Sequence, residues 1–248
     1  MNKKNNAFVL LLFVSCLVLI GSCKRDKSNY TINYQYQYYP LDSNHYITYR
    51  VDSVSYNYNN VSTRDTISYD WKVLVSDSTF YDNTQQLTNI LECYRRPDST
   101  YPWTIDRRWT ANRTTSNLQV NEDDLRFIKL VFPPQLNENW SGNLYLPASE
   151  SSLSPYAVFI NWNYTYTNTD TAFVLPGVTY NHALVVSEVD YESLIQKTLR
   201  REVYVQNIGL IYQEWESLSA GNSGITSDWD TGPINGFRIR MRVTGHYP

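Results

Sequence analysis

The residues of this chain most suited to catalysis are the acidic triplet Glu122, Asp123 and Asp124. Glycoside hydrolysis needs a pair of carboxylates on either side of a sugar. Adjacent residues in a turn point apart, however, and acidic residues are common in turns. We therefore interpret the triplet as a solvated turn, with a glycan-active enzyme as the alternative. The sequence contains no nucleophile elbow, zinc-binding pair, phosphate-binding loop or Rossmann glycine pattern, so we expect no enzyme.

The histidines and cysteines predict neither a metal site nor a disulfide. The three histidines are far apart in the sequence, and none has the spacing of a zinc ligand pair: His45, His182 and His246. We therefore expect no metal and no cofactor. Cys93 is the only cysteine after residue 23, so we expect a small, buried apolar side chain there.

Three arginines alternate near the end of the chain, at Arg238, Arg240 and Arg242. On a β-strand these positions share one face, so their guanidinium groups would form a row. Such a row could bind a carboxylate, a phosphate or an acidic glycan. We favour the other interpretation, in which each arginine pairs with an Asp or Glu on a neighbouring strand.

The chain is rich in aromatic residues, with 22 Tyr and 7 Trp. Flat rings with a polar edge suit sugar stacking, but most rings of a β domain fill its core. Four tryptophans fall in alternating apolar segments and are assigned to the core: Trp71, Trp103, Trp109 and Trp162. The other three lie in or beside predicted loops and are the better binding candidates: Trp140, Trp215 and Trp229.

Residues 1–22 have the features of a secretory signal peptide. Lys3 and Lys4 precede an apolar run over residues 7–20, which is too short to cross a bilayer comfortably. The run ends in Ile-Gly-Ser-Cys, residues 20–23, which resembles the lipobox of bacterial lipoproteins. The resemblance implies cleavage before Cys23 and acylation of that cysteine, an anchor worth about 0.8 kcal/mol per buried methylene. An ordinary secretory signal is the alternative.

About 225 residues follow Cys23, enough for one large β domain with a sizeable core. We predict a lipidated cysteine and tether over residues 23–40 and a single β domain over residues 41–248. Loss of the two signal lysines lowers the formal net charge from −3 to −5. This acidic balance argues against binding to nucleic acid and against electrostatic adhesion to anionic lipid.

Alternation of apolar and polar residues predicts a β-rich chain. The clearest examples are residues 67–75 and residues 237–243. About ten such segments are joined mostly by connections of hairpin length, and no amphipathic helix exceeds a turn or two. We predict an all-β fold of about ten mostly antiparallel strands that form a curved half-barrel, a barrel or a two-sheet sandwich.

Several local features make sharper predictions. Residues 30–38 carry aromatic or aliphatic side chains at even positions, which predicts an edge strand or an extended segment that clasps the domain. The alternation changes phase near Ser53, which predicts a β-bulge. Residues 125–132 are apolar on both faces, which predicts a central strand. We further expect a strand over residues 158–166, a turn at residues 168–170 and a helical turn over residues 191–196.

Five Asp-Ser or Asp-Thr pairs resemble the O-glycosylation motif of Bacteroidota envelope proteins. Their acceptor residues are Ser53, Thr66, Ser78, Ser99 and Thr171. The chain as a whole resembles envelope lipoproteins of the Bacteroidota, in which a lipobox, a short tether and a β domain rich in Tyr, Trp and Asn follow one another. This resemblance implies a location and a fold class, and it carries no catalytic motif.

Together, these observations predict a lipid-anchored cell-envelope protein with a non-enzymatic binding or structural role. The resemblance implies the outer membrane, with the domain facing the periplasm and display on the cell surface as an alternative. An envelope protein or a glycan would be its partner, held by the loops at residues 137–155 and 220–233. Two other functions stay open, a glycan-active enzyme and a carrier whose curved sheet holds a hydrophobic ligand. An apolar cavity would favour the carrier, and two carboxylates facing across a cleft would favour the enzyme.

Overall fold

The computed structural model describes residues 31–58, 62–146, 157–159, 162–220, 228–230 and 234–248. Contacts divide the chain into two units, Met1–Asn33 and Tyr34–Pro248. In the first unit only residues 31–33 are described, and they form neither helix nor strand. The predicted signal peptide and Cys23 lie outside the described residues, so cleavage and lipidation stay predictions. All the strands belong to Tyr34–Pro248.

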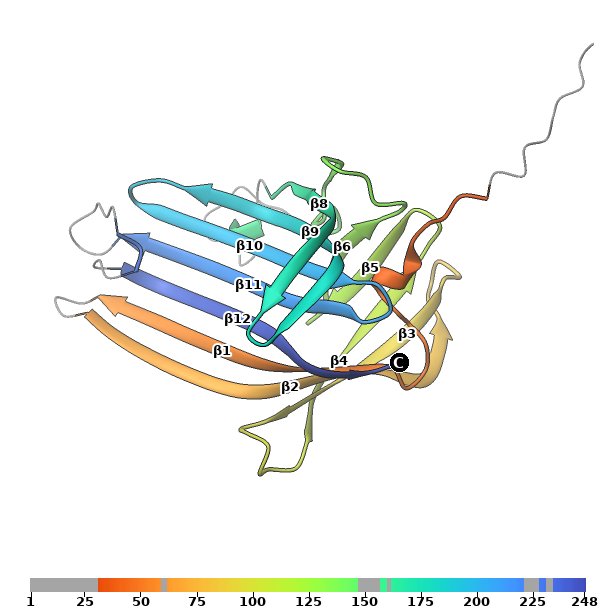
Figure 1. The fold of residues 1–248 in the computed structure, drawn as a ribbon, viewed down its shortest axis with the longest axis horizontal. Coiled ribbons are helices and arrows are strands. Elements are labelled where there is room, and N and C mark those ends of the chain that lie inside the picture. The colour runs from red at the N-terminus through yellow and green to blue at the C-terminus, as the bar shows by residue number, and fades with distance from the viewer. Residues whose placement is uncertain (1–30, 59–61, 147–156, 160–161, 221–227, 231–233) are drawn as a thin grey trace, which may run out of the picture. The chain divides into compact units, whose positions relative to one another are not determined.

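Twelve strands of the described residues form one antiparallel sheet in the order β6-β5-β4-β3-β2-β1-β12-β11-β10-β9-β8-β7 (Figure 1). Their bounds are β1 Tyr46–Tyr58, β2 Ser62–Tyr81, β3 Leu87–Arg96, β4 Thr104–Arg113, β5 Asn117–Glu122, β6 Leu125–Val131, β7 Asn139–Trp140, β8 Tyr164–Leu175, β9 Val178–Glu192, β10 Gln196–Val205, β11 Gly209–Ala220 and β12 Ile234–Tyr247. Two short 3-10 helices are η1 (Tyr36–Tyr38) and η2 (Ala157–Phe159). In this part of the chain, no helix has the length and apolar character needed to span a membrane. The predicted all-β, antiparallel fold is confirmed, in the form of a single curved sheet.

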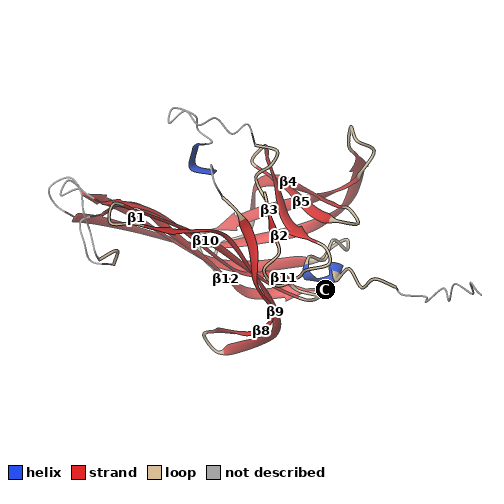
Figure 2. Cartoon of the chain, turned by 90° about the horizontal axis from the view of Figure 1, so that it is seen from above, coloured by secondary structure: helices blue, strands red, loops and turns tan. Residues whose placement is uncertain are grey.

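The alternation in the sequence determines which face each strand buries. Ile47, Tyr49 and Val51 of β1 are buried together with Trp71 of β2 and Cys93 of β3 in one apolar cluster. Residues between them face the other side of the sheet, because side chains alternate along a strand. The sheet is strongly bent, so that β3, β4 and β5 turn away from the plane of β10 and β12 (Figure 2). The cluster therefore lies on the concave face, and Cys93 is buried as expected.

The sheet is nearly closed, because its two edges meet through hydrogen bonds outside the regular ladders. The N–H of Ile128 on β6 donates to Gly142 O (2.6 Å), and Trp140 Nε1 on β7 donates to Ile128 O (2.8 Å). The hydroxyl of Tyr166 on β8 donates to Val131 O (2.7 Å) and accepts from Val131 N–H (2.8 Å). We call these contacts the seam. The seam satisfies backbone groups that an open edge would leave unpaired.

The segment predicted as a central strand lies at an edge instead. In the sheet, β6 pairs with β5 alone, yet Phe127 and Leu130 are only 2% and 0% exposed. The predicted cover on both faces is observed, and the predicted central position is wrong. An apolar run indicates that a segment is buried, but not where the segment lies in the sheet. Here the seam covers β6, which a second neighbouring strand would otherwise cover.

The predicted edge strand over residues 30–38 is also wrong, and the alternative, a clasp, is what the described part of the segment forms. The chain makes the 3-10 turn η1, in which Tyr38 is buried and its hydroxyl donates to backbone carbonyls of β8 and β9. The carbonyl of Gln37 accepts from Asn207 N–H (2.8 Å). These bonds require a turn, so the even-numbered rings do not line one face of a strand. The folded unit thus begins at Tyr34.

The predicted bulge near Ser53 is wrong. β1 pairs with β2 in one continuous register from Tyr46 to Tyr58. The irregularity of β1 lies at Thr48 and Tyr49, where β12 contains Thr244 as an extra residue. The phase change at Ser53 instead marks the point where β1 runs beyond the buried cluster, so its side chains no longer need to alternate.

Three predictions on the later strands are wrong as well. The strand expected over residues 158–166 begins only at Tyr164, after the turn η2. β8 does not turn at residues 168–170 but continues to Leu175, with irregular pairing to β9 that absorbs these turn-favouring residues. Residues 191–196 form no helical turn among the described elements. They close the β9–β10 hairpin, with Ser193 N–H donating to Gln196 O (2.8 Å).

Tyr164 and Tyr166 offer a matched test of the seam, because both are fully buried on β8 but only the Tyr166 hydroxyl has hydrogen-bond partners among the described residues. Tyr166→Phe leaves Val131 backbone groups unpaired, so we expect the free energy of unfolding to fall by about 1–3 kcal/mol. Tyr164→Phe removes a buried hydroxyl without a partner, so we expect a change near zero or a gain. Urea unfolding measures both, and equal losses would show that the Tyr166 hydroxyl does not hold the seam.

Candidate functional site

A cavity of about 270 Å³ lies on the concave face of the sheet. Its walls combine aromatic rings with aliphatic side chains from β1, β2, β3, β4, β11 and β12, among them Tyr49, Val51, Trp71, Leu91, Trp109, Trp215, Ile239 and Met241. Ligand sites are typically concave and mostly apolar with a few polar groups, in volumes of about 300–1,000 Å³. The cavity has this character and lies at the small end of the range.

Residues 34–45 lead from η1 to the start of β1, and we call them the clasp. They close one end of the cavity. Pro40 and His45 line this end, and Nε2 of His45 donates to Ile208 O (2.9 Å). Ile47 and Leu91 beside them are buried. Burial lowers the pKa of His45, which keeps its ring neutral at neutral pH. The closed end therefore presents an uncharged, water-poor surface.

The other end of the cavity is a polar mouth. Strand register places Arg95 of β3 and Arg107 of β4 at this end, beside Tyr69, and both arginines are exposed. The Arg95 guanidinium lies 3.9 Å from the centre of the Tyr69 ring. Arg107 is paired with Asp106 (2.5 Å) and Asp123 (2.6 Å). A ligand would enter past these charged groups.

A cluster of five charged residues adjoins the cavity on the side of β6 and β10: Glu122, Lys129, Glu188, Arg200 and Glu202. Lys129 Nζ lies 2.6 Å from Glu202, 3.1 Å from Glu188 and 3.4 Å from Glu122. Arg200 Nε lies 3.1 Å from Glu188. Lys129, Glu188 and Glu202 are at most 3% exposed, and Glu122 is 19% exposed. We call this group the ionic cluster.

The strands bring the ionic cluster together across the inside of the bent sheet. Lys129 comes from β6 at one edge, whereas Arg200 and Glu202 come from β10, close to the other edge. Glu188 is the extra residue of a bulge in β9, where Arg200 pairs with Val189 and Arg201 with Ser187. Bulges redirect side chains, and this one directs Glu188 into the interior. Tyr204 and Gln213 donate further hydrogen bonds to Glu202.

The surroundings push the pKa values of two buried carboxyls apart. Burial raises the pKa of Glu202, but Lys129 and Arg200 outweigh burial and lower it to about 2. Burial raises the pKa of Glu188 to about 7, more than Arg200 and Lys129 lower it. Glu202 is therefore ionised at neutral pH, whereas Glu188 titrates there.

The acidic triplet is a turn, but it is not merely solvated. Asp123 and Asp124 have positive φ between β5 and β6, and Asp123 accepts from Arg107 and from Trp109 Nε1 (3.2 Å). Glu122 belongs to the ionic cluster. Glu188 and Glu202 share Lys129 between them, so this buried pair brackets an ammonium group and leaves no room there for a sugar.

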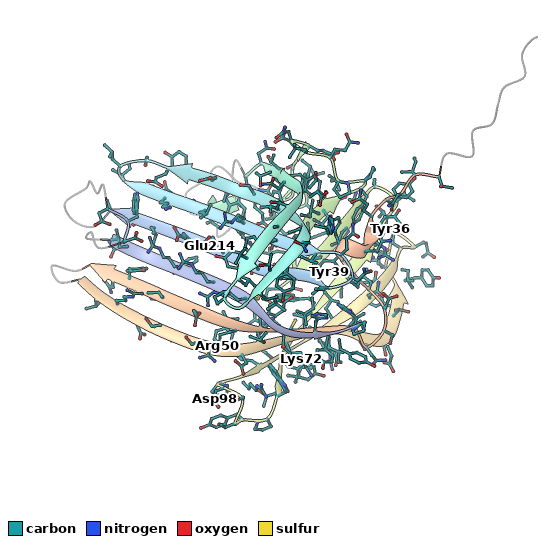
Figure 3. All side chains as sticks on the ribbon, in the orientation of Figure 1. Tyr36, Tyr39, Arg50, Lys72, Asp98 and Glu214 are labelled. Atoms are coloured by element: carbon teal, nitrogen blue, oxygen red, sulfur yellow. The ribbon has the colours of Figure 1, made fainter. Side chains whose placement is uncertain are left out.

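The arginine row is paired with carboxylates of neighbouring strands. Arg238 lies 3.0 Å from Glu216, Arg240 lies 2.8 Å from Glu214, and Arg242 lies 2.7 Å from Asp52. Arg50, Asp70 and Arg96 extend the same ladder across β1, β2 and β3, and Figure 3 labels Arg50 and Glu214 in it. Ile239 and Met241, between the arginines, line the cavity, so the ladder occupies the opposite face.

The three candidate tryptophans serve different parts of the fold. Trp140 belongs to the seam, and Trp229 packs with Leu218 and Ile234. Trp215 lines the cavity, with the Arg200 guanidinium 4.8 Å from its ring centre. Its buried Nε1 has no hydrogen-bond partner among the described residues. Only Trp215 is therefore placed to contact a ligand in the cavity.

The core assignment fails for one of the other four tryptophans. Trp71 and Trp162 are buried, and Trp109 packs partly buried against the core. Trp103 is half-buried on the convex side, where the Arg96 guanidinium lies 4.2 Å from its ring centre. It lies just before β4, outside the alternating register that places Trp109 inside.

The remaining predicted sites lie apart from the cavity. Of the proposed glycosylation acceptors, Thr66, Ser78 and Ser99 are exposed, whereas Ser53 and Thr171 are half-buried. The predicted contact loops at residues 137–155 and 220–233 lie partly outside the described residues. Within the described ranges, no group of His, Cys, Asp and Glu side chains is arranged to hold a metal ion.

The sequence analysis missed Lys129, Glu188, Arg200 and Glu202. Lys129 and Glu188 each interrupt an apolar strand, in Phe-Ile-Lys-Leu-Val and Val-Val-Ser-Glu-Val. Charged residues are almost never fully buried unless paired. Opposite charges inside two such runs were therefore a usable signal for a buried pair.

Comparison with known proteins assigns no family to the chain. No family model matches the chain, and no curated protein matches it. Among solved structures, the chain is similar to a Bacteroides fragilis protein described as exported and as having a YmcC-like fold. The alignment covers 84% of this chain and 98% of that one, with 9% identity and a TM-score of 0.37. Similarity at this level defines neither a family nor a function for the chain.

Glu188 should make stability fall as pH rises. Its native pKa, about 7, lies above the ordinary value of 4.5, so the native state binds its proton more tightly than the unfolded state. The resulting stabilisation is complete below about pH 4.5 and is lost as pH rises through about 7. The contribution of Glu202 to stability changes with pH in the opposite direction. Its native pKa is lowered to about 2, so this contribution is lost only as pH falls toward that value. Lys129, Arg200, Glu122 and Glu202 all face Glu188 and set its titration.

We therefore expect the unfolding free energy of Glu188→Gln to decline by about 2–3 kcal/mol less than that of the native protein between about pH 5 and pH 8. Urea unfolding at several pH values measures this difference. Glu192→Gln, at an exposed site on the same strand, is the control and should keep the native pH profile. If the Glu188→Gln protein also keeps that profile, Glu188 does not titrate in this range.

Proposed function

We propose that this chain is a lipid-anchored cell-envelope protein that binds a small, largely apolar ligand on its concave face and does not catalyse a reaction. The observation that carries the proposal is the cavity, whose walls are mostly apolar side chains with the paired ionic cluster on one side, between the clasp and the polar mouth at Arg95 and Arg107. The anchor rests on the tetrapeptide at residues 20–23. An outer-membrane position facing the periplasm, with surface display as the alternative, rests on the resemblance to Bacteroidota lipoproteins.

Physical reasoning favours a carrier over a purely adhesive scaffold. A ligand that covers apolar wall gains about 25 cal/mol for each Å² removed from water. A scaffold that used only its outer faces would gain nothing from a cavity next to Tyr49, Trp71 and Met241, since close packing is more stable. The convex face is also occupied by its own ion-pair ladder. Ligand binding is therefore assigned to the concave face.

The glycan-active alternative has weaker support. Its candidate carboxylates are engaged, Glu122 with Lys129 and Arg200 and Asp123 with Arg107. A general acid and its partner need to face a sugar from two sides, with the reacting bond between them. The aromatic lining would also suit a sugar face, so binding of a glycan without hydrolysis is an outcome that ligand screening can reveal.

The anchor predicts a clear result for Cys23→Ala. Lipidation requires the thiol, so we expect the variant to move from the membrane fraction to the soluble fraction of cells. Mass spectrometry of the mature N-terminus provides an independent measurement, with a diacylglyceryl-modified Cys23 as the expected residue. A variant that still fractionates with membranes, or an unmodified native N-terminus, would rule out the lipid anchor.

The cavity predicts that Val51→Phe blocks ligand entry. Val51 is 3% exposed and lines the cavity, so the larger ring would occupy space that a ligand needs. We expect the fluorescence of N-phenyl-1-naphthylamine to increase with the native protein and about tenfold weaker binding with the variant, a loss of about 1.4 kcal/mol. Val174→Phe, the same change at an exposed site on β8, should bind like the native protein. No binding of the dye to native protein would contradict the proposed carrier.

A further inference from the structure

The mouth of the cavity holds a positive charge that has no ion-pair partner among the described residues. Arg107 is neutralised by Asp106 and Asp123. Arg95, by contrast, has no carboxylate within ion-pair distance among the described residues. Its guanidinium instead lies over the Tyr69 ring, at 3.9 Å from the ring centre. This cation–π contact holds the guanidinium at the rim of the cavity, and the residue is exposed to solvent.

The two ends of the cavity differ in charge. The closed end at Pro40, His45 and Ile47 is uncharged, and the walls that follow are mostly aliphatic and aromatic, with the paired charges of the ionic cluster on one side. The unpaired charge of Arg95 lies at the opposite, exposed end. A ligand with one apolar tail and one charged end would match this order if its tail entered first.

We infer that the cavity holds the single alkyl chain of a free fatty acid, with the carboxylate at Arg95. The inference rests on the proposed carrier function and names its ligand class. The small volume, about 270 Å³, selects one chain of medium length over a two-chain phospholipid. The guanidinium fork matches the geometry of a carboxylate, which it can bind through two parallel hydrogen bonds.

The position of Arg95 also lowers the free-energy cost of binding an anion. A carboxylate buried in the cavity would lose its hydration, and the two cations of the ionic cluster, Lys129 and Arg200, are already paired with Glu188 and Glu202. At the mouth, the same carboxylate stays partly hydrated and interacts with the guanidinium. The ionic cluster thus offers no free cation to a carboxylate inside the cavity, whereas Arg95 does at the mouth, and this favours entry of the ligand with its tail first.

Decanoate, decanol and decylamine test the inference, because they share one chain and differ in the charge of the head group. Displacement of N-phenyl-1-naphthylamine from the native protein, followed by isothermal titration calorimetry, measures each affinity below the micelle concentration. We expect decanoate to bind about three- to tenfold more tightly than decanol, and decylamine to bind most weakly. The advantage of decanoate should shrink at high salt, since the head group is exposed.

Arg95→Gln keeps a polar, uncharged hydrogen-bonding side chain, although a shorter one, and removes the charge. We expect it to abolish the advantage of decanoate and to leave decanol binding unchanged. Arg64→Gln is the matched control, because Arg64 is likewise an exposed arginine of the sheet beside a tyrosine ring, Tyr56, but lies outside the cavity. It should behave like the native protein with all three probes.

A series from hexanoate to tetradecanoate tests the position of the tail. Each added methylene should raise affinity about fourfold, from about 0.8 kcal/mol per buried methylene, until the cavity is full. Equal binding of decanoate and decanol, or an unchanged advantage of decanoate in Arg95→Gln, would overturn the fatty acid while leaving the carrier in place. Failure of the dye itself to bind the native protein would overturn the carrier and the fatty acid together.

Discussion

The fold depends on one buried ammonium group. Lys129 of β6 lies within 3.1 Å of Glu188 on β9 and Glu202 on β10, so it connects one edge of the sheet to strands near the other edge across the interior. Removing these charges from water costs several kcal/mol per ion, and their attraction offsets this cost only with good geometry and added hydrogen bonds. Tyr204 and Gln213 provide such bonds to Glu202. A closure that kept Lys129 buried but separated it from these carboxylates would leave a charge unpaired, so the cluster favours the observed curvature of the sheet.

The ionic cluster also explains why the concave face contains a cavity. Aliphatic side chains from opposite walls could meet and fill the space inside a bent sheet, as they do in a sandwich core. Here the polar groups of Glu122, Lys129 and Arg200 occupy one wall, and apolar side chains from the other wall cannot pack closely on them without removing the remaining water from Glu122. The walls stay apart, the clasp closes one end, and the mouth stays open. The cavity thus results from the same interaction that closes the sheet.

Sequence reasoning predicted the faces of the strands but not their neighbours. The alternation at Ile47, Tyr49, Val51 and Trp71 correctly indicated one buried face, since side-chain direction along a strand is a local property. The position of β6 at an edge, and the seam that covers it, depend on contacts with Gly142, Trp140 and Tyr166, which no local pattern contains. The ionic cluster was missed for the same reason. Lys129 and Glu188 each look like exceptions within an apolar strand, and only the fold shows that the exceptions meet.

The arginine row shows how the two faces of the sheet differ in what they can bind. Register places Glu214 and Glu216 of β11 opposite Arg240 and Arg238, so like charges along β12 are each neutralised by the neighbouring strand. A partner could bind these guanidinium groups only by displacing the carboxylates of the neighbouring strands that already pair with them. The concave face is different, because β3 places Arg95 beside the Tyr69 ring, and no carboxylate of the described residues lies within ion-pair distance of it. The charge of Arg95 is therefore available to the proposed ligand, next to apolar walls that could hold the tail of that ligand. This contrast, more than the number of arginines on either face, supports placing the ligand-binding function inside the curve of the sheet.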